Sequence, residues 1–188
     1  MSKTKSKIAL LLCLVSLSSF IVGGKEASAA DTWRGHWSNE TAIPFLNNVT
    51  GNTTLKGLVN TAAMDNWNNN TWVIDFYRTS YASNRQIKVD NVDLSSVSWT
   101  GKAEGASYNW DGSGHYYVVN IKLNEGKNIM NYSQSKLKGL IAHEFGHAVG
   151  LQHRNTSSYL MYPYDTRRQY VPNTNETYSL QLHYAHQK

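Results

Sequence analysis

Apolar residues recur along this chain with two periods, which predict short strands and helices in a definite order. The glycine-, serine- and asparagine-bearing segment 101–114 predicts a loop, and a last helix is expected at residues 175–186. The order is strand, helix, several strands and two helices, which predicts a single α/β or α+β domain. β-Branched and aromatic residues favour strands at residues 40–46, 71–78, 86–90, 95–102 and 115–123.

Two further segments carry apolar residues at helical spacing and have residues typical of helix ends. The first is residues 55–67, and Thr54 is available as its N-cap. The second follows a cap at Ser133 or Ser135 and ends near Gly150, a residue type that commonly terminates helices.

Residues 1–30 have a different pattern from the rest of the chain. A lysine-rich start precedes an almost wholly apolar run at residues 8–22, and a small-residue stretch follows at residues 27–30. This three-part order is typical of a secretory signal peptide. A membrane anchor is the alternative, because about fifteen apolar residues lie near the lower limit for a spanning helix. We expect residues 1–30 to be removed and residues 31–188 to form one secreted, extracellular domain.

The charge of the chain depends strongly on this first segment. Lys and Arg number 18 against 13 Asp and Glu, a formal charge of +5, and the isoelectric point near 9.2 suggests a nucleic-acid binder. Four lysines and one glutamate fall within residues 1–30, which leaves +2 for the remainder. We therefore expect no nucleic-acid partner. The single cysteine, Cys13, also lies there, so the expected domain has neither a disulfide nor a thiol ligand.

Candidate chemistry is concentrated in the second of the two helices and directly after it. His143 and His147 are four residues apart and project from one helix face, so that their ring nitrogens can converge on one ion. Gly150 can adopt positive φ and turn the chain back, which makes His153 a third ligand. Three imidazoles plus a water are the ligands of a catalytic zinc ion. We expect one such Zn²⁺ ion, and a structural or surface role for the four other histidines.

Glu144 lies next to His143, about 100° further around the helix. This places its carboxylate beside the metal, where it can take a proton from a bound water. A secreted binding module that contains zinc without turnover is the alternative, suggested by the six Trp and twelve Tyr. Structural zinc normally has four protein ligands, so three histidines and an adjacent glutamate favour an enzyme.

The extended pattern of residues 143–153 resembles that of the metzincin zinc endopeptidases, and Met161 supplies the Met-turn that follows in that group. Phe145, the Leu-Met-Tyr-Pro sequence at 160–163 and the spacing from His153 to Met161 look most like the matrixins, the matrix-metalloproteinase branch. A weaker likeness extends over most of residues 31–188.

This resemblance implies an α+β fold with a twisted, mixed five-stranded sheet, three helices and zinc in a cleft. Met161 would form a hydrophobic floor below the metal. The residues of the matrixin structural zinc site are not recognisable in this sequence. A structural Ca²⁺ ion is unsupported, and the turn at residues 111–114 is its one candidate position.

The activity that the resemblance implies is that of a secreted metalloprotease, a hydrolase of extended protein or peptide substrates. Glu144 would act as the catalytic general base and then protonate the leaving amine. We expect the substrate to add as a strand along residues 115–123, with Pro163 and Tyr164 bordering the pocket after the cut bond. The Pro-x-Tyr wall of matrixins is replaced by Pro163-Tyr164-Asp165. We expect a monomer with no membrane contact after signal cleavage.

Overall fold

A five-stranded mixed sheet forms the centre of the protein. The computed structural model describes residue 32 and residues 35–83, 86–105 and 114–185, so the expected signal peptide and most of the 111–114 turn lie outside the described residues. The strand order is β2-β1-β3-β5-β4, in which β4 runs antiparallel to β5 and the other neighbouring pairs are parallel. The strands are β1 (Ile43–Asn47), β2 (Phe76–Thr79), β3 (Gln86–Val92), β4 (Gly101–Gly105) and β5 (Val118–Asn124).

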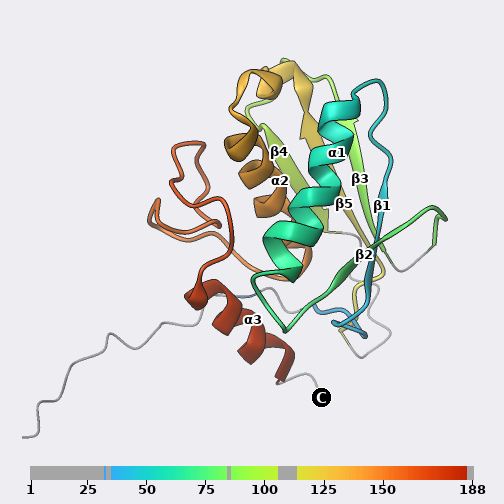
Figure 1. Ribbon diagram of the computed structural model, residues 1–188, viewed down its shortest axis with the longest axis vertical. Helices are drawn as coiled ribbons and strands as arrows, with labels where there is room; N and C mark the ends of the chain where they lie inside the picture. Colours follow the sequence, from blue (N-terminus) through green and yellow to red (C-terminus); the bar gives the residue numbers. More distant parts are fainter. Residues whose placement is uncertain (1–31, 33–34, 84–85, 106–113, 186–188) are drawn as a thin grey trace, which may run out of the picture.

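Three α-helices accompany the sheet, which confirms the α+β fold and the element numbers implied by the resemblance. Helices α1 (Thr53–Thr61) and α2 (Gln134–Ala148) lie beside each other against the sheet, while α3 (Thr174–Ala185) lies beyond their ends (Figure 1). A π-helical segment, η1 (Ala62–Asn68), continues α1, and two short 3₁₀ turns precede α2. Within the described parts of the chain, no helix has the length and apolarity needed to cross a membrane.

Aromatic packing fixes α2 on the sheet. The fully buried Phe145 ring of α2 lies edge-on to Phe45 of β1 and Phe76 of β2, at centroid distances of 5.5 and 5.0 Å. Such aromatic pairs add about 0.5–1.5 kcal/mol each beyond the burial of their area. From η1, the buried Trp67 indole donates a hydrogen bond to the Ala142 carbonyl at 2.9 Å. The middle turns of α2 are therefore held from two sides.

Two of the strand predictions are wrong in extent or place. The strand expected at 71–78 forms only at Phe76–Thr79. Its first residue, Thr71, is instead bonded to the end of η1, because its N–H donates a hydrogen bond to the Trp67 carbonyl. The strand expected at 95–102 is absent before Gly101, and β4 instead occupies the start of the predicted 101–114 loop. Strands β1, β3 and β5 confirm the remaining predictions within a few residues.

The buried side chain of Asn124 explains why residues 94–99 do not form a strand. Its Oδ1 accepts from the Leu94 N–H at 2.8 Å, and its Nδ2 donates to the Leu94 and Trp99 carbonyls at 2.8 and 3.1 Å. A side-chain amide thus satisfies backbone groups that a sheet ladder would otherwise use. A contact from a residue distant in sequence decides this segment.

The first helix begins at a different cap from the one predicted. Asn52, not Thr54, occupies the N-cap, and its Oδ1 accepts from the Leu55 N–H at 2.9 Å. Asn52 Nδ2 also donates to the Glu125 carboxylate at 2.7 Å, which connects the helix start to the turn after β5. Thr54 is exposed within the first turn.

We expect Asn52→Ala to lower the free energy of unfolding by about 1–2 kcal/mol, through loss of the cap and of the Glu125 contact. The melting temperature should fall by about 3–6 °C, as judged from thermal unfolding followed by circular dichroism. Thr54→Ala is the matched control and should stay within about 0.5 kcal/mol of the wild type. An equal loss in both variants would contradict the observed cap.

Candidate active site

Helix α2 presents His143 and His147 on one face, and backbone carbonyls orient both rings. The Nδ1 atom of His143 lies 2.8 Å from the Leu160 carbonyl oxygen, and that of His147 lies 2.7 Å from the Leu151 carbonyl oxygen. A carbonyl oxygen only accepts hydrogen bonds, so each Nδ1 carries the proton. The Nε2 atoms are then the ones that would bind a metal ion.

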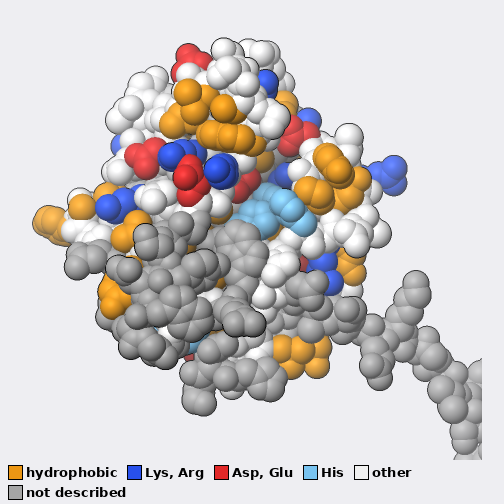
Figure 2. Space-filling model, turned by 180° about the vertical axis from the view of Figure 1, so that it is seen from behind, with side chains coloured by type: hydrophobic (Ala, Val, Ile, Leu, Met, Phe, Trp, Pro, Cys, Tyr) orange, Lys and Arg blue, Asp and Glu red, His pale blue; other side chains and the backbone are white. Residues whose placement is uncertain are grey.

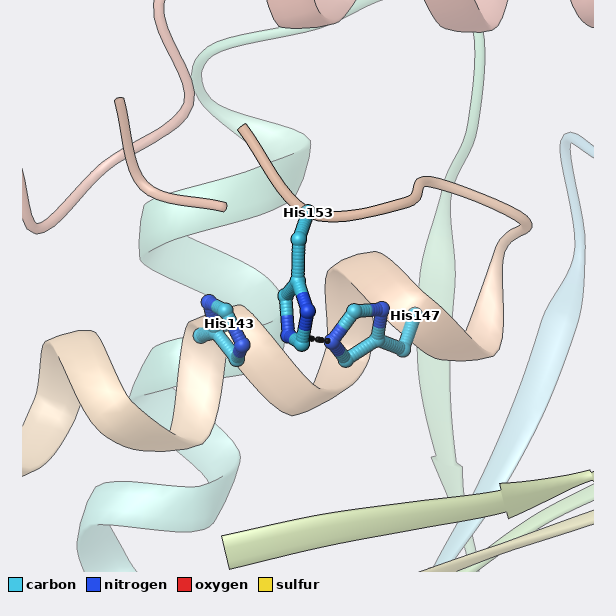
Figure 3. Close-up of side chains that lie close together, drawn as sticks. All are labelled: His143, His147 and His153. Atoms are coloured by element: carbon cyan, nitrogen blue, oxygen red, sulfur yellow. Dashed lines mark hydrogen bonds between the residues drawn. The ribbon is translucent and has the colours of Figure 1, made fainter. Parts of the chain in front are cut away.

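The turn predicted at Gly150 is confirmed. Its φ is +102°, its N–H donates to the His147 carbonyl at 3.0 Å, and the next N–H, of Leu151, donates to the Gly146 carbonyl at 3.0 Å. This pair of bonds is the Schellman arrangement, which ends a helix and reverses the chain. The reversed segment carries His153 back towards α2 (Figure 3).

The three histidine rings converge on one point. Their possible ligand atoms all lie within 4.8 Å of one another, and the Nε2 atoms of His147 and His153 are 3.0 Å apart. Figure 3 shows the rings of His143 and His147 on α2 and that of His153 between them. Burial lowers the pKa of His147 to about 4 and also lowers that of His143, so both rings are neutral at neutral pH. Neutral imidazoles are what zinc requires, and this set could hold one ion.

Glu144 stands beside this cluster and is not one of its converging groups. Its side chain is buried, and burial raises its pKa to about 8, an effect that the positive charge of Arg167 and a hydrogen bond from the Ala103 backbone oppose. A Cβ atom added at Gly101 would lie 2.7 Å from Glu144 Oε1. The first residues of β4 therefore limit where the carboxylate can lie.

A cavity of about 560 Å³ opens over the histidines and Glu144. Its lining comes from residues 101–103 of β4, from α2, and from Pro163, Tyr164 and Arg167 of the segment after Met161. Figure 2 shows the histidines in a hollow of the surface, with acidic and basic side chains beside them. The cavity thus joins an edge of the sheet to the three imidazoles.

Met161 lies fully buried behind α2, and its backbone is bonded on both sides. A Cβ atom at Gly146 would clash with its sulfur, so the helix approaches Met161 as closely as a glycine permits. The Met161 carbonyl accepts from the Arg154 N–H at 2.8 Å, and the Met161 N–H donates to Glu176 Oε1 at 2.8 Å. The other oxygen of Glu176 accepts from the Asn173 N–H at 2.9 Å.

Three polar residues of the cavity region have no sequence motif that marks them as functional. Arg167 lines the cavity with only 5% of its surface exposed, and Asp165, also in the lining, accepts a hydrogen bond from the Tyr132 hydroxyl. The Arg167-Arg168 pair in the sequence is typical of a solvated loop, so no local signal indicated that its first member is buried. Tyr132 precedes α2 and likewise has no distinguishing motif.

The histidines outside the cluster have contacts of a structural kind where the structure describes them. His183 Nε2 lies 2.8 Å from the Gly35 carbonyl oxygen, and the rings of His36 and His115 pack edge to face at 4.7 Å. None of the three lines the cavity. His186 lies outside the described residues.

We expect Gly101→Ala to reduce turnover by about 10- to 100-fold while the fold is retained, because the new methyl group displaces the Glu144 carboxylate. The measurement is kcat/KM on a cleaved peptide, together with the melting temperature. Gly57→Ala on α1 is the control, since a Cβ atom there meets no atom within 4 Å. If both variants keep wild-type kcat/KM, Gly101 does not position Glu144.

A comparison with protein families agrees with the geometry. The sequence model described as Matrixin matches residues 35–184, which includes the whole sheet, the three helices and the histidine cluster. The chain has no significant match among curated proteins. Because the family model spans most of the sequence, the resemblance seen in residues 143–163 is confirmed, and the chain belongs to the matrixin family.

Proposed function

We propose that residues 31–188 form a secreted zinc endopeptidase that hydrolyses extended protein substrates in the cavity over α2. Membership of the matrixin family supports a zinc metallopeptidase domain that acts on peptides or proteins. The observation that carries the finer proposal is the convergence of three imidazoles within 4.8 Å beside the separately held carboxyl group of Glu144. A buried acid next to three metal-binding nitrogens is the arrangement that metal-assisted hydrolysis requires.

His143, His147 and His153 would hold the zinc ion through their converging ring nitrogens. The backbone carbonyls of Leu160 and Leu151 keep the first two rings in the tautomer that a metal needs. Zinc, when bound, supplies a Lewis acid that favours ionisation of water near neutral pH and polarises the carbonyl of the peptide bond to be cut. His153 is the exposed member, on the side where a substrate would enter.

Glu144 would move the proton of the reaction. Its carboxylate accepts a proton from the attacking water as the new C–O bond forms, and delivers it to the leaving nitrogen as the C–N bond breaks. The Ala103 hydrogen bond and the charge of Arg167 oppose the rise in the pKa of Glu144 that burial causes, and a cation held by the three histidines would favour the ionised form further. The second proton of the water leaves with the products, which are a carboxylate and a protonated amine.

The substrate is expected along β4. The earlier expectation that residues 115–123 form the receiving edge is wrong, because β5 lies between β3 and β4. Strand β4 is at the end of the sheet order, and its residues Gly101, Lys102 and Ala103 line the cavity. An extended peptide could add its backbone to this edge and bring one bond over the histidines.

Export rests on the sequence pattern of residues 1–30. N-terminal sequencing of protein recovered from the medium of an expressing culture should give a start near residue 31. Recovery of uncleaved chain in the membrane fraction would favour the anchor alternative.

A peptide-library digest tests the proposed activity. The purified protein, loaded with zinc, should cut internal bonds of library peptides, and a chelator should stop the cutting. Zinc bound at one equivalent with no cleavage of any peptide would favour the binding-module alternative. Cleavage that a chelator leaves unchanged would contradict the metal-dependent mechanism.

A further inference from the structure

A positive charge is buried in the cavity lining, on the segment that follows Met161. Arg167 is 5% exposed, and one terminal nitrogen, Nη1, donates to the Gly139 carbonyl at 3.3 Å. Its Nε is sealed from solvent without a hydrogen-bond partner among the described residues. The second terminal nitrogen, Nη2, forms no hydrogen bond within the described chain and is not among the fully sealed atoms, so part of its surface is accessible. The guanidinium is only partly satisfied by the protein.

The carboxylates near Arg167 are engaged elsewhere. Asp165 accepts from the Tyr132 hydroxyl through Oδ2 and lies 3.5 Å from the Thr100 hydroxyl through Oδ1. Glu144 is close enough to interact electrostatically and accepts from the Ala103 backbone. Neither forms an ion pair with Arg167, whose described contacts contain no carboxylate within 4.0 Å. Burial lowers the pKa of Arg167, while the charges of Glu144 and Asp165 raise it and so offset part of the cost of desolvation.

The position of Arg167 relative to Glu144 identifies which substrate residue it would meet. Glu144 passes its proton to the leaving nitrogen in the proposed mechanism, so the residue that carries this nitrogen lies on the Glu144 side of the histidines. Arg167 lies beside the turn of α2 that precedes Glu144, because its Nη1 donates to the Gly139 carbonyl, and it lines the cavity together with Leu140 and Pro163. The side chain of this residue would point into the pocket that Arg167 closes.

We propose that Arg167 is a specificity-determining residue that selects a substrate with a carboxylate side chain, Glu or Asp, on the residue that carries the leaving nitrogen. This inference rests on the proposed function. The methylene groups of such a side chain pack against Leu140 and Pro163, while a carboxylate oxygen accepts from Nη2. A charge-assisted bond of this kind is about twice as strong as a neutral one, and it would add a direct ion pair to the longer-range attraction that Glu144 and Asp165 already provide.

End-blocked peptides that differ only at this residue test the proposal. With wild-type protein we expect kcat/KM for Glu to exceed that for Gln and Leu by about tenfold or more, and Lys to be cut most slowly. The Glu and Gln peptides have nearly the same shape, so their ratio reports the charge. Arg167→Met should bring the Glu-to-Gln ratio close to one. Arg167→Lys, which keeps the charge, should retain part of the preference.

Arg168→Met is the matched control, because Arg168 is exposed and does not line the cavity; its Glu-to-Gln ratio should equal that of the wild type. If the wild-type protein gives a Glu-to-Gln ratio of kcat/KM near one, that result alone overturns the proposal. The proposal therefore stays testable even if Arg167→Met fails to fold. A second set of peptides ends in a free carboxylate at the same residue. A strong preference for those peptides, irrespective of side chain, would show that the guanidinium binds a chain terminus and would also overturn it.

Different results would contradict the role of Arg167 and the proposed endopeptidase activity. Cleavage that depends on zinc but shows no preference for acidic residues removes the role of Arg167 and leaves the proposed endopeptidase intact. Absence of cleavage from every peptide, acidic ones included, removes the proposed function itself.

Discussion

Glu144→Gln is expected to lower kcat by about 10²–10⁴-fold while the zinc content stays at one ion per chain. The amide is nearly the same size as the carboxyl group, so the close packing against Gly101 is kept. It can accept no proton from the attacking water and deliver none to the leaving nitrogen. The measurements are kcat on a peptide identified in the library digest and zinc by elemental analysis of the same sample.

Asp65→Asn provides the matched control for this substitution. It makes the same carboxylate-to-amide change on η1, where Asp65 is exposed and pairs only with Lys138 at 3.2 Å. Its kcat should equal that of the wild type. Near-normal turnover by Glu144→Gln would sink the general-base assignment, and loss of zinc from that variant would make Glu144 part of the metal site instead.

Removal of zinc should have the second large effect, on both activity and stability. An ion held at a thousandfold excess over its dissociation constant stabilises the native state by about 4 kcal/mol, since the three imidazoles converge only after folding. For a domain of this size, we expect the melting temperature to fall by about 8–16 °C after dialysis against a chelator. Peptide cleavage should stop in the same sample.

Recovery after metal addition shows whether the effect is specific. Zinc should restore the melting temperature and the activity together, and calcium should restore neither, because imidazole nitrogens are poor ligands for it. His147→Ala should reproduce the chelated state and respond little to added zinc. Unchanged melting and activity after chelation would refute a zinc site at these histidines.

The histidine cluster was largely predictable from the sequence, because short-range geometry determines it. A spacing of four residues places His143 and His147 on one helix face whatever the rest of the fold is. The turn that ends α2 requires a positive φ at Gly150, a conformation that glycine adopts readily, and the observed φ is +102°. Burial of α2 could also be foreseen from its apolar residues.

Features that depend on long-range contacts could not be predicted in this way. The start of β4 depends on the Asn124 side chain at the end of the neighbouring β5, which bonds backbone groups of Leu94 and Trp99. Asn52 is favoured as the N-cap because its side chain also donates a hydrogen bond to Glu125, which is far away in sequence. Arg167 has the local sequence of a surface loop, and only the tertiary fold turns it into the cavity wall.

The single carboxylate of Glu176 has a consequence for how such a protein can diversify. It holds the N–H groups of both Met161 and Asn173, so the loop between them begins and ends at one fixed point. Residues 162–172 can therefore be exchanged or lengthened while Met161, and with it the support of the histidines, stays in place. Under the proposed function, substrate preference would depend on Pro163 and Arg167 in this loop and could change separately from the groups that carry out hydrolysis.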